Sequence, residues 1–446
     1  MSKSRKQAFE YIKQKVWLRI QGWQEKLLSK VGKEVLIKAV AQAIPTYAMS
    51  CFDLTKGLCD ELSSMIARWW WSQQDKTNKI HWLSWEKLTM SKENGGLGFR
   101  DLHLFNIAML ARQAWRLLTN PGTLCARVLK AKYYPHTDVL HSSAKDGISY
   151  SWRSILKGVE LLKEGLIWRV GDVNSLKIWK DPWIPRSSTR KPITPRAGSI
   201  LTKVSELIDP VLGEWDEALI DDNFWNVDAE EIKKIPLHDG VDDWAAWRYD
   251  PKGVFSVKSA YKVAVRKRDM GSGRDASSSS GSVYGTHTFD WLKIWRCKVA
   301  HKVQMFVWWF THNSLAVRCN LARKGVEIDK ICPVCKRFDE DNGHLFFKCK
   351  NARACWLALN LERERKIMVQ CQSGKEAMSK LWTFAETTQQ KILTFMWRWW
   401  LARNKVNVGE KMSSTWDTCQ SVEFHLGEQE RISKKNSQAK QPTVQR

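Results

Sequence analysis

The sequence predicts an α+β fold that is mainly α-helical, in which a helical N-terminal segment leads to short β-hairpins and a small helical domain. Three observations support this prediction. Over residues 8–118 apolar side chains recur every three to four positions, which is the period of an amphipathic helix. Between residues 165 and 257 they alternate over short runs, which is typical of strands joined by turns. A compact Cys/His motif after residue 331 predicts the small domain.

Length and charge limit the function classes. The chain has 446 residues, room for two or three domains, and its 43% hydrophobic content is that of a globular protein. Lys and Arg number 72 against 47 Asp and Glu, which gives a net charge of +25. This surplus favours a polyanionic partner, most often nucleic acid. The alternative, a basic surface that serves only solubility, stays open.

Cysteine usage predicts a reducing compartment. The 11 cysteines are odd in number and lack the regular pairing of a secreted disulfide framework. The first six residues are polar, and no apolar run of 18 residues occurs. We therefore expect an intracellular location, nuclear or cytoplasmic, and no membrane partner. In that setting clustered cysteines more often bind metal than one another.

Three helices are expected first. One spans residues 8–31 and ends at Gly32, a second spans 33–44 and stops at Pro45, and a third spans 56–71. The first two are strongly basic. We expect six cations of these two helices to contact phosphates: Lys15, Arg19, Lys26, Lys30, Lys33 and Lys38.

A turn is expected at the glycine-rich stretch 95–98, because glycine tolerates positive φ. A phosphate-cradling loop would need a following Gly-Lys-Ser/Thr, which is absent, so the turn is favoured. The helical period then returns over residues 101–118. Further on, β-hairpins are expected at 165–185 and 244–257, the second with its turn at 250–253.

Beyond the hairpins, Ser256 or Ser259 is expected to cap a helix. Residues 271–288 hold six Ser and four Gly and are interpreted as a flexible insert. The aromatic stretch 289–325 has helical spacing, and another helix is expected from about Ala352.

The strongest motif is Cys332, Cys335, His344 and Cys349, with the spacing C-x2-C-x8-H-x4-C. Three thiolates and one imidazole form a donor set that zinc accepts, and soft sulfur ligands argue against Mg²⁺ or Ca²⁺. Four protein ligands leave no open position for water. We therefore expect one structural Zn²⁺ per chain and a zinc-stabilised helical domain. The alternative is four incidental residues in a chain with 11 Cys and 10 His.

This stretch resembles the reverse-transcriptase zinc-binding domain in the C-terminal part of plant non-LTR (LINE-type) retrotransposon polyproteins. The surrounding motifs that carry the resemblance are Phe255–Tyr261, Trp291–Trp295, Lys302–Trp308, His312–Leu315 and Ala354–Trp356. The stretches that resemble the segment after the polymerase core are Ala43–Cys51, Lys92–Arg100 and Ile178–Pro185. Trp397–Asn404 resembles the stretch that precedes a ribonuclease H domain.

The resemblance implies five segments. They are a basic helical segment after the missing polymerase core (1–150), a Trp-rich β-hairpin connection (151–250), the reverse-transcriptase zinc-binding domain (251–360, with the insert 271–288), a helical segment that would precede ribonuclease H (361–433) and a disordered basic tail (434–446).

The resemblance also implies which activities to expect. The family polymerase binds two Mg²⁺ through a Tyr/Phe-x-Asp-Asp pair, and neither Asp221-Asp222 nor Asp242-Asp243 follows an aromatic residue. Both pairs, like the acidic run 339–341 in the zinc loop, are interpreted as solvated surface groups. We therefore expect no polymerase activity, no ribonuclease H domain and no small-molecule substrate.

The leading hypothesis is a non-catalytic, zinc-binding, nucleic-acid-binding fragment of such a reverse transcriptase, with RNA or DNA as a non-specific partner. The cations near the metal motif that are expected to contact phosphates are Lys336, Arg337, Lys348 and Lys350. Two alternatives stay open, a protein–protein docking module and a degenerate transposon remnant without selected function.

Overall fold

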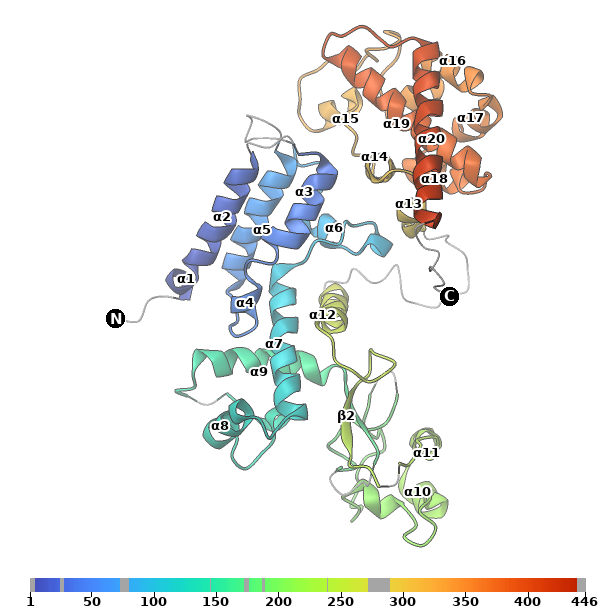
Figure 1. Ribbon diagram of the computed structural model, residues 1–446. Coiled ribbons are helices and arrows are strands. Elements are labelled where there is room, and N and C mark those ends of the chain that lie inside the picture. The colour runs from blue at the N-terminus through green and yellow to red at the C-terminus, as the bar shows by residue number, and fades with distance from the viewer. Residues whose placement is uncertain are drawn as a thin grey trace, which may run out of the picture. The chain divides into compact units, whose positions relative to one another are not determined.

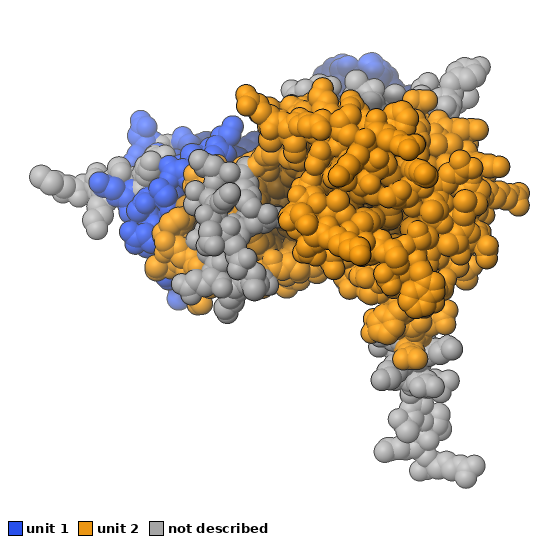
Figure 2. All heavy atoms as spheres, turned by 90° about the horizontal axis from the view of Figure 1, so that it is seen from above, with its two compact units in different colours: residues 1–16, 42–63, 101–282 blue, residues 17–41, 64–100, 283–446 orange. Residues whose placement is uncertain are grey.

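The computed structural model describes residues 5–24, 28–72, 80–144, 146–171, 176–186, 189–238, 240–271 and 289–438 (Figure 1). They form two compact units, each assembled from three stretches of chain (Figure 2). Unit 1 comprises Met1–Val16, Gln42–Ser63 and Asp101–Ser282. Unit 2 comprises Trp17–Ala41, Ser64–Arg100 and Val283–Arg446. The five segments expected from the sequence stay predictions.

The described residues are mainly helical, which confirms the predicted fold class. Up to residue 171 the elements are α1 Arg5–Ala8, α2 Glu10–Gln24, α3 Lys30–Leu36, the π-helix η1 Ile37–Ala41, α4 Thr46–Met49, α5 Lys56–Trp71, α6 Trp85–Thr89, η2 Lys92–Asn94, α7 Leu102–Thr119, α8 Leu124–Tyr133, η3 Val139–His141, α9 Tyr150–Lys163 and β1 Leu166–Arg169. Up to residue 271 they are η4 Val204–Leu207, α10 Glu217–Asn223, α11 Asn226–Lys233, β2 Trp244–Trp247 and α12 Val257–Gly271. The C-terminal elements are α13 Leu292–Arg296, α14 His301–Thr311, α15 Arg318–Arg323, the π-helix η6 His344–Lys348, α16 Lys350–Ala358, α17 Glu362–Met368, α18 Gly374–Leu381, α19 Glu386–Asn407 and α20 Thr415–Gln438.

The core of unit 1 is built where α7 crosses α9 (Figure 1). Gly158 allows the close crossing, because a Cβ at that position would lie 2.3 Å from the carbonyl carbon of Leu110. Asp101 caps α7 by accepting hydrogen bonds from the backbone N–H of His103 and Leu104. The helix predicted over residues 101–118 is therefore confirmed.

The predicted pairing of the strands was wrong. β1 pairs antiparallel with β2, with Leu166 opposite Trp247, so each strand takes its partner from the other predicted hairpin. The turn 250–253 does form, since the Gly253 N–H donates to the Asp250 carbonyl at 3.0 Å. Alternation shows which side chains share a face, but it leaves the partner strand to the tertiary structure. Residues 172–175, inside the first predicted hairpin, lie outside the described residues.

The N-terminal helix boundaries also differ from the prediction. Gly32 lies inside α3, whose N-cap is Ser29, so it does not end the first helix. Pro45 precedes α4, and the stretch before it is partly the π-helix η1. α5 has the predicted bounds, 56–71. The spacing of apolar residues predicted where these helices lie, whereas the side-chain cap of Ser29 determines where α3 begins.

The glycine-rich stretch 95–98 forms the predicted turn. Gly95 has φ +83°, and a Cβ there would lie 2.6 Å from the ring of Trp291. Its carbonyl accepts hydrogen bonds from Trp308 Nε1 at 2.9 Å and His312 Nε2 at 2.7 Å. The turn is therefore an anchor of the unit 2 core.

Toward the C-terminus, Ser256 caps α12 by accepting from the Ser259 N–H at 3.1 Å, as one of the two predicted alternatives. The insert expected at 271–288 lies outside the described residues except for residue 271. α20 continues to Gln438, so the tail expected to be disordered from residue 434 begins as helix, and residues 439–446 lie outside the description. None of the helices in the described ranges is both long and apolar enough to cross a membrane.

Candidate metal centre

The first two candidate ligands lie on a tight loop. An antiparallel bridge between Ile331 and Asp339 closes the base of this loop. Inside it the Cys332 N–H donates to the Phe338 carbonyl at 2.8 Å, and the Lys336 N–H donates to the Cys332 carbonyl at 2.9 Å. Lys336 has φ +54°, a left-handed conformation that reverses the chain directly after Cys335. The C-x2-C spacing thus forms a knuckle that presents both sulfurs on one side.

The other two candidate ligands flank a single π-helical turn, η6. The Cys349 N–H donates to the His344 carbonyl at 2.7 Å, a bond that spans five residues and encloses the four between them. The Asp341 carboxylate accepts from the His344 N–H at 2.6 Å where the turn begins. The H-x4-C spacing therefore corresponds to one π-helical turn with a candidate ligand at each end.

Long-range donors hold this turn in place. Trp356 Nε1 on α16 donates to the Phe346 carbonyl at 2.8 Å, and Trp399 Nε1 on α19 donates to the Leu345 carbonyl at 2.9 Å. Arg365 Nη1 on α17 donates to the Phe347 carbonyl at 2.8 Å. Three elements therefore satisfy three consecutive carbonyls of a turn with few bonds of its own.

The four ligand atoms of Cys332, Cys335, His344 and Cys349 lie within 4.8 Å of one another. Cys332, His344 and Cys349 are buried and Cys335 is half-buried, and the sulfur of Cys335 lies 3.2 Å from His344 Nε2. Three sulfurs and one imidazole nitrogen at one point fit a closed Zn²⁺ site. Such a site cross-links the segments that carry its ligands and leaves no coordination position open.

The protonation of the cluster is coupled. The hydrogen bond with Cys349, together with burial, raises the pKa of Cys332 to about 12. That same hydrogen bond lowers the pKa of Cys349. The hydrogen bond with Cys332 raises the pKa of His344. A metal ion at this point competes with these protons, because cysteine binds metal as thiolate and histidine as neutral imidazole.

The acidic run 339–341 was expected on the surface, and for Glu340 this was wrong. The Glu340 side chain is fully buried, and it accepts hydrogen bonds from Nε of Arg403 at 2.7 Å and from Nη2 of the same guanidinium. It also accepts from the Arg318 N–H at 2.8 Å. The bidentate ion pair ties the loop between the two ligand pairs to α19.

The four cations expected near the metal motif are all exposed. Lys336 and Arg337 lie on the knuckle, and Lys348 and Lys350 lie on either side of Cys349. Within the described ranges no ion pair joins any of them to a carboxylate. The exposed Asp339 and Asp341 lower the net positive charge of this surface without cancelling it.

The N-terminal cations that the structure describes differ in how far their side chains are exposed to solvent. Lys15 and Arg19 are exposed on α2, and Lys26 lies outside the described residues. Lys33 is buried and donates to the Trp69 carbonyl at 3.0 Å and to the Ser72 carbonyl at 2.7 Å.

Lys30 and Lys38 are also engaged within the protein. The Lys30 ammonium donates to the Trp70 carbonyl, and Lys38 pairs with the buried Glu34 at 2.6 Å. Lys30 and Lys33 therefore cap the C-terminal end of α5, where cations are favoured. Lys33 is buried and its ammonium is engaged by two carbonyls, which contradicts the expectation that it contacts phosphates, whereas for Lys30 and Lys38 that expectation stays a prediction.

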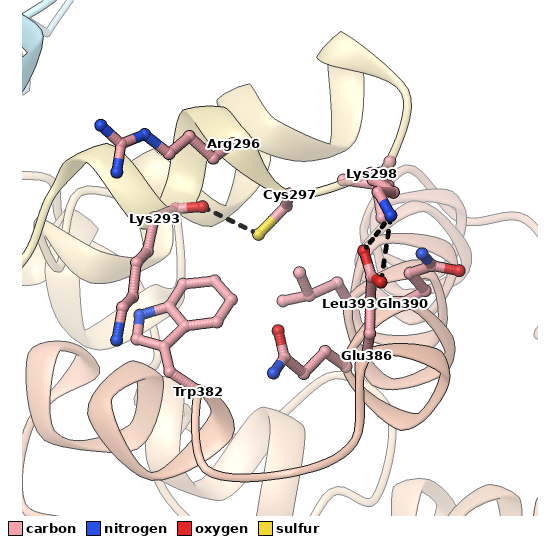
Figure 3. Close-up of a pocket in the computed structure, with 10 residues that line it drawn as sticks. Lys293, Arg296, Cys297, Lys298, Trp382, Glu386, Gln390 and Leu393 are labelled. Carbon is pink, nitrogen blue, oxygen red and sulfur yellow. Dashed lines mark hydrogen bonds and ion pairs between the residues drawn. The ribbon is translucent and has the colours of Figure 1, made fainter. Parts of the chain in front are cut away.

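A separate cavity of about 280 Å³ opens in unit 2 between α13 and the start of α19 (Figure 3). The Trp382 ring and the Lys298–Glu386 ion pair line it, with N···O at 3.0 Å. The Cys297 thiol donates to the Lys293 carbonyl, and burial raises the pKa of Cys297 to about 12. Burial therefore disfavours the thiolate form of this wall residue.

A family model described as zinc-binding in reverse transcriptase matches residues 255–356. An uncharacterized mitochondrial protein of Arabidopsis thaliana is 46% identical over 152 residues, which is 34% of this chain and 99% of that protein. A putative ribonuclease H protein of the same plant is 28% identical over 378 residues, which is 81% of this chain and 57% of that protein. The chain thus spans little more than half the length of the second relative.

Proposed function

Because this chain belongs to the retrotransposon-derived plant proteins with a reverse-transcriptase zinc-binding domain, we propose that it is a non-catalytic nucleic-acid-binding fragment. The observation that carries the proposal is the surface around the candidate metal centre. There the exposed cations Lys336, Arg337, Lys348 and Lys350 lie beside the four candidate ligands. A phosphate backbone is the partner that such a surface favours.

In this proposal one structural Zn²⁺ is bound by Cys332, Cys335, His344 and Cys349. The ion cross-links the knuckle to η6, whose ligands already approach one another, with Cys335 Sγ 3.2 Å from His344 Nε2. Lys336 and Arg337 lie on the knuckle, Lys348 lies on η6 and Lys350 begins the next helix, α16. Metal binding therefore fixes the spacing between two cation pairs, which supports phosphate contacts at a defined separation.

The carboxylates support a non-catalytic role. Asp221 forms an ion pair with Lys233 at 2.8 Å, and Asp243 accepts from the Gly171 N–H at 2.9 Å. Asp222 and Asp242 are exposed. Two-metal polymerase or nuclease chemistry needs carboxylates that converge on one point, whereas Asp221 and Asp243 make separate local contacts.

The proposed origin is a LINE-type (non-LTR) element, as the motifs along the chain indicate, and the proposed setting is intracellular and reducing. Thiolate ligands persist where disulfides do not form, which agrees with this setting. The partner is RNA or DNA bound without sequence preference, since no base-reading element is evident at the knuckle. We expect a dissociation constant on the order of 10⁻⁴ to 10⁻⁶ M at physiological salt.

Salt-dependent binding tests the proposal. The zinc-loaded chain is titrated with a labelled single strand at several salt concentrations by fluorescence anisotropy. Four phosphate contacts predict a log–log slope near about −3, and the double variant Lys348→Gln/Lys350→Gln should reduce its magnitude by about 1.4.

The matched control removes two exposed lysines elsewhere, in Lys130→Gln/Lys132→Gln on α8 of unit 1. It should leave the slope within experimental error of the unmodified chain. A flat salt titration, or equal losses in both double variants, would reject the knuckle surface as the binding site. A flat titration combined with binding of an apolar protein partner would instead support the docking-module alternative.

A further inference from the structure

An aromatic side chain stands among the cations of the knuckle. Phe338 directly follows Lys336 and Arg337, and 64% of its surface is exposed to solvent. It lies between the two ligand pairs, on the loop closed by the Ile331–Asp339 bridge. Neither the metal centre nor the phosphate contacts proposed above require an apolar ring at this position.

The backbone of Phe338 is held firmly although its ring is exposed. Its carbonyl accepts the Cys332 N–H at 2.8 Å, so the residue is hydrogen-bonded directly to a candidate metal ligand. The ring packs against the His344 imidazole, with ring centroids 5.7 Å apart and planes inclined by 51°. The ring is therefore presented from a rigid support, which limits the entropy lost when a ligand packs on it.

The charges around the ring define its ligand. Lys336 and Arg337 precede it, and Lys348 and Lys350 extend from the segment that carries His344 and Cys349. Cations attract phosphates, and an exposed ring offers a face on which a nucleobase stacks. A base in a duplex has both faces covered by its neighbours, whereas a base in a single strand can leave the stack.

We propose that Phe338 is a base-stacking platform and that the knuckle takes a single-stranded nucleic acid in preference to a duplex. The inference rests on the proposed function and names the substrate class of that same surface. The cations hold the phosphate backbone, and the ring receives one unpaired base regardless of its identity, because every base has a stacking face.

A single exposed apolar residue is common on protein surfaces, and Phe424 provides the comparison. Phe424 on α20 is 62% exposed, so it matches Phe338 in residue type and exposure but lies outside the metal loop. If exposure alone produced binding, both phenylalanines would contribute. The proposal assigns the effect to Phe338 because only its ring belongs to the cation-bearing knuckle.

The experiment uses the full, zinc-loaded chain and three probes of about 12 nucleotides: an oligothymidylate, an abasic strand with the same phosphates, and a duplex. Phe338→Ala should weaken oligothymidylate binding by about 5- to 150-fold, from the range of one stacking contact, and leave the abasic strand unaffected. Phe424→Ala should change neither. Phe338→Trp should retain affinity, whereas Phe338→Leu, which is apolar without a π face, should lose it.

Zinc content is measured for every variant, and if Phe338→Ala loses zinc the comparison rests on the Leu and Trp variants. Unchanged oligothymidylate affinity in the Ala or Leu variant would overturn the inference, as would equal losses on oligothymidylate and abasic strand. Duplex binding as tight as single-strand binding would also overturn it. In each of these cases, a salt slope that still depends on Lys348 and Lys350 would leave the proposed function supported. Loss of all salt-dependent binding would reject both the proposed function and the stacking inference.

Discussion

The buried pair Glu340–Arg403 should control how tightly the knuckle holds its metal. Arg403 is almost fully buried on α19, and its guanidinium makes two hydrogen bonds to the fully buried Glu340. Arg403→Met keeps an apolar chain of similar length and removes the charge. It leaves the Glu340 carboxylate buried, and among the described residues the Arg318 N–H, at 2.8 Å, is then its remaining hydrogen-bond donor.

The magnitude follows from this geometry. Removing one partner of a buried ion pair destabilises a protein by about 3–5 kcal/mol, and the remaining N–H donor argues for the lower end. Glu340 lies between the two ligand pairs in sequence. The loss of stability therefore affects the loop that must be ordered for metal to bind. A loss of about 3 kcal/mol corresponds to zinc binding that is weaker by about 100-fold.

Competition with a chromophoric zinc chelator measures this affinity in the full chain. Arg398→Met is the matched control, because Arg398 lies on the same helix, packs over Trp397 at 5.6 Å and forms no ion pair with a carboxylate of the described residues. The double variant Glu340→Leu/Arg403→Met removes both charges and should recover most of the lost affinity. The reasoning is refuted if Arg403→Met binds zinc within twofold of the unmodified chain, or if the double variant is no better than the single one.

Three further outcomes are expected. Cys335→Ala should lower zinc from about one per chain to none by metal analysis, because three ligands no longer close the site; stoichiometric zinc in this variant would contradict the ligand assignment. Burial lowers the pKa of His312 from 6.5 to about 4, so the unfolded chain binds a proton that the folded chain excludes. Stability to urea should therefore fall as pH drops from 6.5 toward 4, and His312→Gln should make this fall shallower; an unchanged pH dependence would argue against it. Lys33→Met should lower stability by about 1–3 kcal/mol, since the ammonium that donates to the Trp69 and Ser72 carbonyls at the end of α5 is lost, without changing oligonucleotide affinity; weaker oligonucleotide binding in folded protein would restore Lys33 as a phosphate contact.

Local features were predictable from the sequence. The helix over 56–71 and the helix over 101–118 follow from apolar period, and the turn at 95–98 follows from glycine's tolerance of positive φ. The candidate ligands could be recognised because their spacings correspond to two local structures, a reversing knuckle and one π turn. Each is completed within six residues, so the sequence interval fixes which side chains converge.

Features that depend on distant partners could not be predicted in the same way. Alternation in residues 166–169 indicated a strand, but the fold selected 244–247 as its partner in place of the nearer segment. In the sequence Lys33 does not differ from the other basic residues. In the fold the C-terminal end of α5 lies beside it, and its ammonium caps that helix. Glu340 stands in an acidic run typical of a surface turn, and only the approach of Arg403, 63 residues further along the chain, makes its burial favourable. Sequence spacing therefore determined the candidate metal ligands, whereas tertiary packing decided which charged groups are buried in pairs and which remain exposed for a partner, because desolvation of a charge is offset only by a partner brought close in space.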